Sequence, residues 1–283
     1  MNRSPLHPIT DADIRTYEED GVVCLRGQFD EEWIARMLEA AVAQLDQPDG
    51  FRVEGEAGAE AGRAAALAKS HMARRNDTFR AFVEESPAAE ITARLMGLDE
   101  VRFFYDQLFI KEPGTHAATA WHHDLPFWPL DGNHVASVWL ALTPVTKATS
   151  GLVYLAGSHK WGKLYRPVPA VPRDGFAFPE ADAYEECPQF HKEFGNPDHR
   201  FLAWDMEPGD CLVHHPLTVH GAGDNASSDQ RRVALSCRFF GGDITWHGQR
   251  TVFQVPGSAD EMFEVGAFPG NDEIFPIVWR DAA

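Results

Sequence analysis

Two short segments, about a hundred residues apart, carry side chains that suit a metal site. The first contains His122 and Asp124 in the run Trp-His-His-Asp, and the second begins at His220. Two imidazoles and one carboxylate suit non-haem Fe(II), because this set leaves positions open for O2 and a co-substrate. Arg231 follows His220 by eleven residues, and its planar guanidinium suits bidentate capture of a carboxylate. The pattern therefore predicts an iron site with an anion-binding arginine nearby.

The His-x-Asp pair is weak evidence by itself, so its surroundings matter. With 13 His and 22 Asp in 283 residues, chance placement gives about one such pair. If the strand that contains His122 continues to Asp124, both side chains point to the same face. His220 follows the β-prone stretch 217–219. We expect it to face the same barrel mouth, which is a favoured place for a site.

The first hundred residues indicate a mostly helical segment. Thr10 and the acidic residues after it predict a helix that ends near Gly21. A short strand is expected next, and Asp30 precedes a second helix with one apolar stripe. The composition of residues 48–64 predicts a mobile loop, and two further helices are expected over 74–84 and 87–96.

From Val101 onward the composition is typical of strands separated by turns. Many short strands with regular turns predict an all-β barrel or sandwich. The expected strands cover residues 101–105, 108–110, 135–142, 152–155, 211–213 and 233–240.

The chain is expected to form a single domain over residues 1–283. Its parts are a helical region 1–100, a β core 101–245 and a tail 246–283. Residues 162–200 interrupt the strand pattern with many prolines and acids. Such a long insertion is typical of either a functional lid or a disordered segment.

Composition excludes several functional classes. The formal net charge of −18 argues against nucleic acid as a partner, since proteins that bind it usually carry a basic surface. No apolar run is long enough to span a bilayer, so no membrane partner is expected. The four cysteines lack metal or redox spacing, which favours free thiols. The amino terminus does not resemble a signal peptide, and we expect a cytoplasmic protein.

Five stretches together resemble the phytanoyl-CoA dioxygenase-like branch of the Fe(II)/2-oxoglutarate oxygenases. The resemblance covers most of residues 65–245 in the order of the family. It implies a mainly β fold with flanking helices (α+β) around a double-stranded β-helix, the jelly-roll or cupin-like core. The five stretches are residues 105–114, 119–124, 137–142, 151–162 and 220–232.

The resemblance also implies roles for individual residues. His122, Asp124 and His220 match the iron ligands, and Arg231 matches the residue that binds the distal carboxylate of 2-oxoglutarate. Three further positions match residues that line the co-substrate in the family: Gln107, Trp139 and Lys69. The implied cofactors are Fe(II), 2-oxoglutarate and O2. The implied reaction is hydroxylation, or another oxidation, of an unactivated C–H bond of a small molecule, with release of succinate and CO2.

The chain departs from the family pattern at two positions. His123 stands where Gln is common, and on a strand it points away from the metal. Ala222 stands where Ser is frequent, which removes one hydrogen bond to the co-substrate. Lys111 is typical of the family, and we expect a surface lysine at a strand end. The carboxylate of Asp124 occupies the position that halogenases on this scaffold leave to halide, so halogenation is not expected.

Two other classes of function use the same three ligands. A zinc-dependent hydrolase needs three protein ligands and a water, but it has no use for a buried guanidinium near the metal. A non-catalytic cupin-like binding protein is the other class, and the complete ligand set argues against it. The fold alone does not separate these classes. Substrate identity and oligomeric state are not encoded in any motif.

Overall fold

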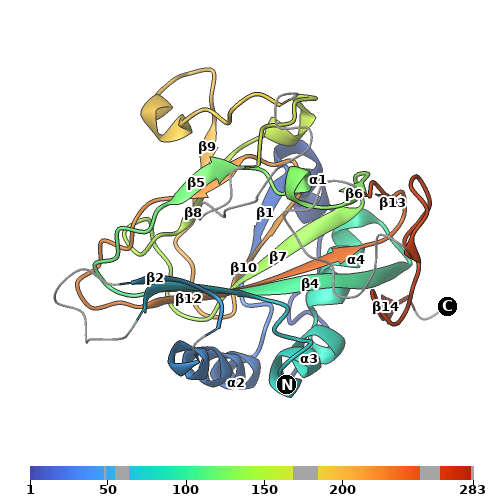
Figure 1. The fold of residues 1–283 in the computed structure, drawn as a ribbon, viewed down its shortest axis with the longest axis horizontal. Helices are drawn as coiled ribbons and strands as arrows, with labels where there is room; N and C mark the ends of the chain where they lie inside the picture. Colours follow the sequence, from blue (N-terminus) through green and yellow to red (C-terminus); the bar gives the residue numbers. More distant parts are fainter. Residues whose placement is uncertain (48, 55–63, 168–183, 249–261, 282–283) are drawn as a thin grey trace.

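Two antiparallel sheets face each other at the centre of the protein (Figure 1). The computed structural model describes residues 1–47, 49–54, 64–167, 184–248 and 262–281. The larger sheet has the order β1-β10-β7-β12-β4-β3-β2, with β14 also paired to β4, and the smaller has the order β5-β11-β8-β9. This arrangement is the jelly-roll, cupin-like fold that the sequence predicted.

The larger sheet collects strands from nearly the whole length of the chain. Its strands are β1 (Val22–Leu25), β2 (Phe51–Glu54), β3 (Ala64–Ser70), β4 (Glu100–Lys111), β7 (Val135–Ala141), β10 (Cys211–His214), β12 (Arg232–Phe240) and β14 (Ile277–Arg280). The smaller sheet and a separate two-stranded ribbon use shorter strands. These are β5 (Thr119–His122), β8 (Leu152–Leu155), β9 (Phe201–Leu202) and β11 (His220–Ala222), and in the ribbon β6 (Leu130–Asp131) and β13 (Thr245–Trp246).

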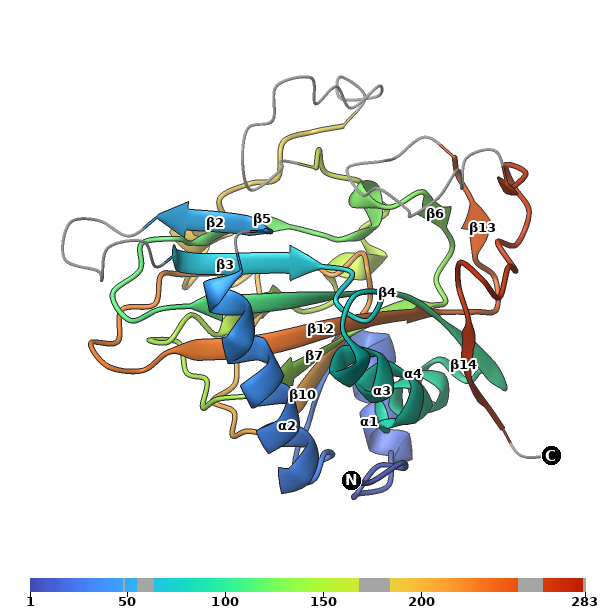
Figure 2. The ribbon, with the colours of Figure 1, turned by 60° about the horizontal axis from the view of Figure 1, so that its bottom comes forward.

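Within the described residues, helices α1 to α4 lie on the side of the larger sheet that faces away from the smaller one (Figures 1 and 2). Thr10 begins α1 with a capping box, in which its hydroxyl and the Asp13 carboxylate satisfy each other's backbone N–H groups. Gly21 ends this helix at a φ of 76°, which only glycine adopts readily. The helices are α1 (Asp11–Asp20), α2 (Glu31–Val42), α3 (Asp77–Glu85) and α4 (Ala88–Met96), with short 3₁₀ turns η1 (Ala43–Asp46), η2 (Leu125–Phe127), η3 (Ser158–Lys160) and η5 (Phe190–Glu193).

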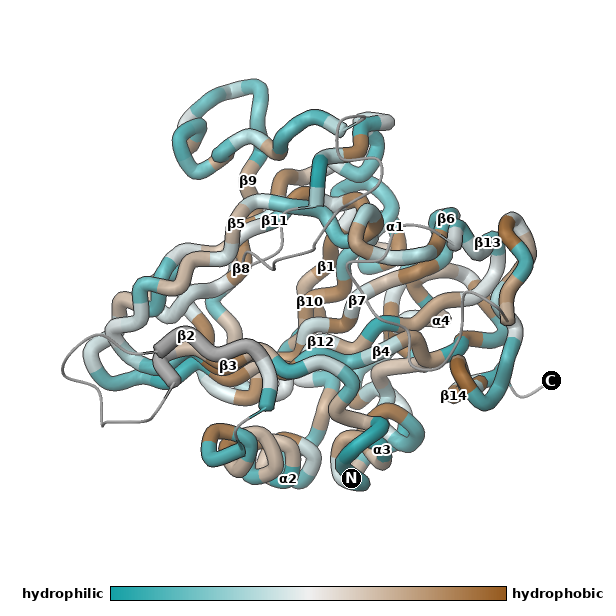
Figure 3. The backbone as a smooth tube through the Cα atoms, viewed as in Figure 1, coloured by the Kyte–Doolittle hydropathy of each residue, from teal (hydrophilic) through white to brown (hydrophobic). Residues whose placement is uncertain are grey.

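The two faces of the larger sheet have different roles because side chains alternate along each strand. On the outer face, Leu140 and Leu235 belong to the core beneath the helices. On the inner face, Trp139 and Ala234 pack with Tyr154 of the smaller sheet. Figure 3 shows hydrophobic colours along β7 and β10, whereas the turns around β9 are mostly hydrophilic.

The helices predicted from the sequence are confirmed to within a few residues. The loop expected over residues 48–64 is wrong in part, because 51–54 form β2 and β3 begins at Ala64, while 48 and 55–63 lie outside the described residues. Of the insertion 162–200, residues 168–183 lie outside them too, so a lid there stays a prediction. Among the described residues, no helix is both long and apolar enough to cross a bilayer.

Candidate metal centre

The three predicted metal ligands meet between the two sheets. His122 is the last residue of β5, and His220, the first residue of β11, lies directly opposite it in the strand pairing. Asp124 is not on a strand, since β5 ends at His122 and Asp124 begins the turn η2. The prediction that a strand aligns His122 with Asp124 is therefore wrong, although the turn still brings the carboxylate to both imidazoles.

The geometry of these three side chains fits one divalent ion. The Nε2 atom of His122 lies 3.5 Å from Oδ1 of Asp124, and Nε2 of His220 lies 3.9 Å from the same oxygen. All three ligand atoms lie within 4.8 Å of one another. Ligand bonds of about 2.1 Å at right angles place ligand atoms about 3 Å apart, so a small inward movement completes the site.

Backbone carbonyls fix the ring orientation of both imidazoles. Nδ1–H of His122 donates to the Ala120 carbonyl at 2.8 Å, and Nδ1–H of His220 donates to the Thr218 carbonyl at 2.9 Å. This bonding assigns the free lone pair of each ring to Nε2, the atom that faces Asp124. Burial lowers the pKa of His220 well below its ordinary value, so this ring is neutral and ready to bind a metal.

The second oxygen of Asp124 is held by the inner face of the larger sheet. Oδ2 accepts a hydrogen bond from the Ser137 hydroxyl at 3.1 Å and another from Nε2–H of His214 at 3.4 Å. Nδ1 of His214 in turn lies 3.1 Å from the Tyr154 hydroxyl. Burial alone raises the pKa of Asp124, but hydrogen bonds to His122 and His214 hold that pKa well below its ordinary value. His214 therefore supports one of the three predicted metal ligands.

His123 points away from the metal set, as the sequence predicted. Its side chain is buried, and its Nε2 accepts a hydrogen bond from the backbone N–H of Tyr165 at 2.8 Å. Burial lowers the pKa of His123 to about 4, which keeps the ring neutral as this bond requires. Its role is to join the metal-bearing segment to the start of the insertion.

The structure places the predicted Arg231 near the surface. This side chain is 28% exposed, and its Nε donates to the Glu112 carboxylate at 2.8 Å. The next residue, Arg232, is only 3% exposed and lies on the inner face with its guanidinium 5.7 Å from the centre of the Trp139 ring. Arg231 precedes β12 (Arg232–Phe240), whereas Arg232 is the first residue of the strand and shares its inner face with Trp139.

Lys111 is the second cation of this interior, and the expectation of a surface lysine is wrong. It is paired with Arg232 across β4 and β12 and is 7% exposed. Its ammonium donates to the Ser150 hydroxyl at 2.8 Å and to the Thr119 hydroxyl and the Gly223 carbonyl at 3.3 Å each. Burial, and then the charge of Arg232, lower the pKa of Lys111 to about 7.

Among the described residues, Arg232 makes no ion pair with a carboxylate. Burial lowers its pKa to about 10, so it stays charged at neutral pH. A buried, charged guanidinium without a counter-ion is costly. Together with Lys111, it therefore forms a cationic end of the interior that is suited to a carboxylate from a ligand.

The remaining predicted residues divide between the two faces of the sheet. Gln107 and Trp139 both lie opposite Ser236 of β12, so they share the inner face. Lys69 lies opposite Leu108, whose side chain belongs to the core on the outer face. Its ammonium is fully buried and lies 2.6 Å from the Asp49 carboxylate. The structure therefore places Gln107 and Trp139 on the inner face of the sheet and Lys69 on the outer face.

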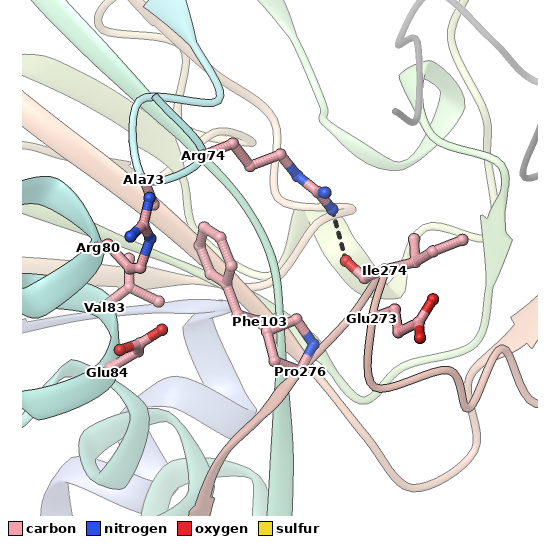
Figure 4. A pocket seen from close by; sticks show the side chains of 9 residues that line it. All are labelled: Ala73, Arg74, Arg80, Val83, Glu84, Phe103, Glu273, Ile274 and Pro276. Carbon is pink, nitrogen blue, oxygen red and sulfur yellow. Dashed lines mark hydrogen bonds between the residues drawn. The ribbon is translucent and has the colours of Figure 1, made fainter. Parts of the chain in front are cut away.

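A separate hollow of about 240 Å³ lies beside α3, and none of the metal-site residues lines it. Figure 4 shows Arg74 reaching across this hollow to the Ile274 carbonyl, at 2.5 Å, with Phe103 and Pro276 at its floor. Phe103 belongs to the core on the outer face of the larger sheet. The hollow therefore has no access to the metal set.

Several known proteins are similar to this chain in sequence. The family described as Phytanoyl-CoA dioxygenase (PhyH) matches residues 17–233. A probable phytanoyl-CoA dioxygenase of Caenorhabditis elegans is 28% identical over 128 residues, or 44% of this chain and 36% of that protein. The multifunctional dioxygenase prhA of Penicillium brasilianum is 26% identical over 250 residues, or 83% of this chain and 74% of that protein. The match to the nematode protein thus spans little more than a third of its length.

Solved structures show the same fold over almost the whole chain. The non-heme alpha ketoglutarate dependent epimerase SnoN from nogalamycin biosynthesis has a TM-score of 0.71 at 23% identity, covering 96% of both chains. The carbocyclase SnoK has a TM-score of 0.70 at 22% identity, covering 98% of this chain and 99% of its own. A further SnoN structure is a complex with Fe3+, alpha ketoglutarate and nogalamycin RO. Since the family match covers three quarters of the residues, this chain belongs to the phytanoyl-CoA dioxygenase (PhyH) family.

Proposed function

We propose that the protein is an Fe(II)- and 2-oxoglutarate-dependent oxygenase of a small-molecule substrate. The proposed reaction inserts one oxygen atom of O2 into an unactivated C–H bond, and the other enters succinate as 2-oxoglutarate loses CO2. The observation that carries this proposal is the pairing of a His/Asp/His set with a buried cationic end in one interior. A metal site alone serves many reactions, whereas the unpaired cations require a second, anionic ligand in the same interior.

In this proposal His122, Asp124 and His220 hold the metal, which when bound supplies the activation of O2 that side chains cannot perform. Arg232 holds the distal carboxylate of 2-oxoglutarate, the role that the sequence assigned to Arg231. Lys111 lies beside Arg232 and adds positive charge at the same end.

The walls of the interior contribute by excluding water and by giving the co-substrate one orientation. Trp139, Tyr154 and Leu152 are buried between the sheets, and such a water-poor surrounding strengthens each charged interaction in the site. Gln107 is half-buried on the same inner face and provides an amide that can hydrogen-bond to the co-substrate or to the substrate. Ser137 and His214 keep the Asp124 carboxylate turned toward the metal, because hydrogen bonds to a metal ligand fix its orientation.

The same residues argue against the two other classes of function. A zinc hydrolase uses its metal to activate water and needs no cation pair at a distance from it. A non-catalytic binding protein has no need for a complete ligand set with fixed imidazole orientations. The alternatives predict metal binding without co-substrate binding, which gives them a distinct experimental signature.

The test is an anaerobic titration of the metal-free protein with Fe(II) and then 2-oxoglutarate, followed by visible absorption. We expect a weak charge-transfer band that requires both additions. His122→Ala should abolish the band, and the matched control His116→Ala should keep it, because His116 is exposed and its side chain lies against Asp224. Tight metal binding without the band in the wild-type protein would overturn the proposal in favour of a zinc enzyme.

A further inference from the structure

A second buried arginine lies at the metal end of the interior. Arg238 is 5% exposed and belongs to the inner face of β12. In the strand register it lies between Ser137 of β7 and Tyr105 of β4, and Ser137 lies next to His214 of β10. Ser137 and His214 are the residues that hold Asp124, so Arg238 continues the row of side chains that supports the metal.

The guanidinium of Arg238 is only partly used by the protein. It lies 4.5 Å from the centre of the Tyr105 ring. One Nη donates to the Ser236 carbonyl at 3.2 Å and the other to the Gln107 amide oxygen at 3.4 Å, both long bonds. Its Nε is buried and has no hydrogen-bond partner among the described residues. A guanidinium offers five N–H groups, so three of them remain for a ligand.

The neighbouring carboxyl groups do not neutralise Arg238. Asp124 is committed to the metal, and no carboxylate among the described residues makes an ion pair with Arg238. Asp106 precedes Gln107 on β4 and bonds to the Ala73 backbone N–H. Burial raises the pKa of Asp106 to about 7, so it does not provide a full negative charge at neutral pH.

The proposed metal and co-substrate do not balance the positive charge of Arg238. Asp124 and the two carboxylates of 2-oxoglutarate bring three negative charges. A divalent metal and Arg232 bring three positive charges, even before Lys111 is counted. Buried charges need a partner, so the positive charge of Arg238 remains for one more anion at the level of the metal.

We propose that Arg238 binds a carboxylate of the substrate beside the metal, and hence that the substrate is an organic acid. This inference rests on the proposed oxygenase function. The surroundings favour an acid with an aromatic or bulky apolar body. Tyr105, Leu125 and Trp128 form an apolar cluster at this end, and the partly buried Phe127 meets the edge of the His122 ring at 5.8 Å between centres.

The experiment compares an acid with its neutral analogue on the Fe(II)- and 2-oxoglutarate-loaded protein under anaerobic conditions. The probes are phenylacetate and phenylacetamide, measured by calorimetry and by the shift of the charge-transfer band. We expect phenylacetate to bind at least tenfold more tightly than phenylacetamide. Arg238→Gln should remove that preference, and Arg238→Lys, which keeps the charge, should keep part of it. The matched control Arg26→Gln, at an exposed arginine paired with Asp210, should leave the preference unchanged.

Two results overturn the inference. If the wild-type protein shows no preference for the acid, or if Arg238→Gln retains it, Arg238 only supports the fold. If Arg238→Gln weakens 2-oxoglutarate tenfold or more, Arg238 serves the co-substrate. Thermal unfolding of each variant checks that it folds, with Arg238→Lys as the less disruptive change. If no band forms with Fe(II) and 2-oxoglutarate, the oxygenase function itself fails, and calorimetry of the two probes still decides the role of Arg238.

Discussion

Replacing each of two adjacent arginines in turn should show which of them binds the co-substrate. Arg232→Gln removes a guanidinium that is 3% exposed and has no carboxylate partner among the described residues. Removing one partner of a buried, hydrogen-bonded charge pair costs about 2–5 kcal/mol. At about 1.4 kcal/mol per tenfold, the dissociation constant of 2-oxoglutarate should therefore rise roughly 30-fold to several thousand-fold.

Arg231→Gln is the matched control one residue away. Arg231 forms a partly exposed ion pair with Glu112, and pairs of this kind contribute about 0–1 kcal/mol to the free energy of unfolding. We expect no measurable change in 2-oxoglutarate affinity for this variant. The assay is an anaerobic 2-oxoglutarate titration of the Fe(II)-loaded proteins, followed by the charge-transfer band, with calorimetry as a second measurement.

The opposite effects of the two variants on 2-oxoglutarate affinity would contradict the assignment of Arg232. Loss of affinity in Arg231→Gln with normal affinity in Arg232→Gln would mean that the strand register of β12 is shifted by one residue. Equal losses in both would indicate that the change in net charge, rather than one buried contact, sets the affinity. Unchanged 2-oxoglutarate affinity in both variants would mean that the cationic end is not part of the co-substrate site.

Three further predictions concern the support of the site and the response to pH. Lys111→Met should weaken 2-oxoglutarate about tenfold, and because the wild-type lysine has a pKa of about 7, wild-type affinity should fall above pH 7 while that of the variant stays flat. Ser137→Ala should lower Fe(II) affinity about tenfold, measured by competition with a metal-binding dye, because Asp124 loses a hydrogen bond. Burial lowers the pKa of His215 to about 3, so the stability linked to its neutral form is complete above the unfolded value of about 6.5 and is lost as pH falls. Urea unfolding between pH 7 and pH 5 should therefore show a loss about 2 kcal/mol smaller in His215→Asn than in the wild-type protein.

The metal ligands could be predicted from the sequence because their types and spacing are restrictive. Few chemistries use two histidines and one aspartate in this order, and His220 lies opposite His122 in the structure, where a shared barrel mouth requires it. The local geometry at Asp124 could not be predicted, because a strand and a 3₁₀ turn both bring its carboxylate near the imidazoles. Only the folded chain shows that Ser137 and His214 hold the second oxygen.

The sequence contains the information that distinguishes Arg231 from Arg232 as the anion-binding residue. The prediction of Arg231 depends on its spacing of eleven residues after His220. Residues Val233, Leu235 and Cys237 of β12 belong to the helix-covered core. The even-numbered residues of the strand therefore face the interior, and this alternation selects Arg232. The spacing between His220 and the arginine crosses a loop, and one extra loop residue changes this spacing. The alternation of side chains along β12 does not depend on loop length, so it identifies the inward-facing residue more reliably.

Lys69 and Lys111 show a different limit of sequence reasoning. Both are buried lysines, and neither the composition nor the neighbours of either residue indicate burial. The partner of Lys69 is Asp49, which comes from the segment expected to be a loop. Lys111 is held by Ser150 and Gly223, which come from distant parts of the chain. Such environments arise from tertiary packing, and no local pattern reports them.

The two faces of the central strand β12 have different roles. The outer face contributes to stability, and the inner face carries residues for ligand binding. Its outer residues Val233, Leu235 and Phe239 are fully buried beneath the helices, and each such burial contributes roughly 1.5–3 kcal/mol to folding. Its inner face carries Arg232 and Arg238, whose unpaired charges oppose folding until ligands arrive. Ligands that bind only the folded state stabilise it in proportion to their concentration. Inner-face substitutions should therefore change ligand affinity more than stability, and outer-face substitutions should do the opposite.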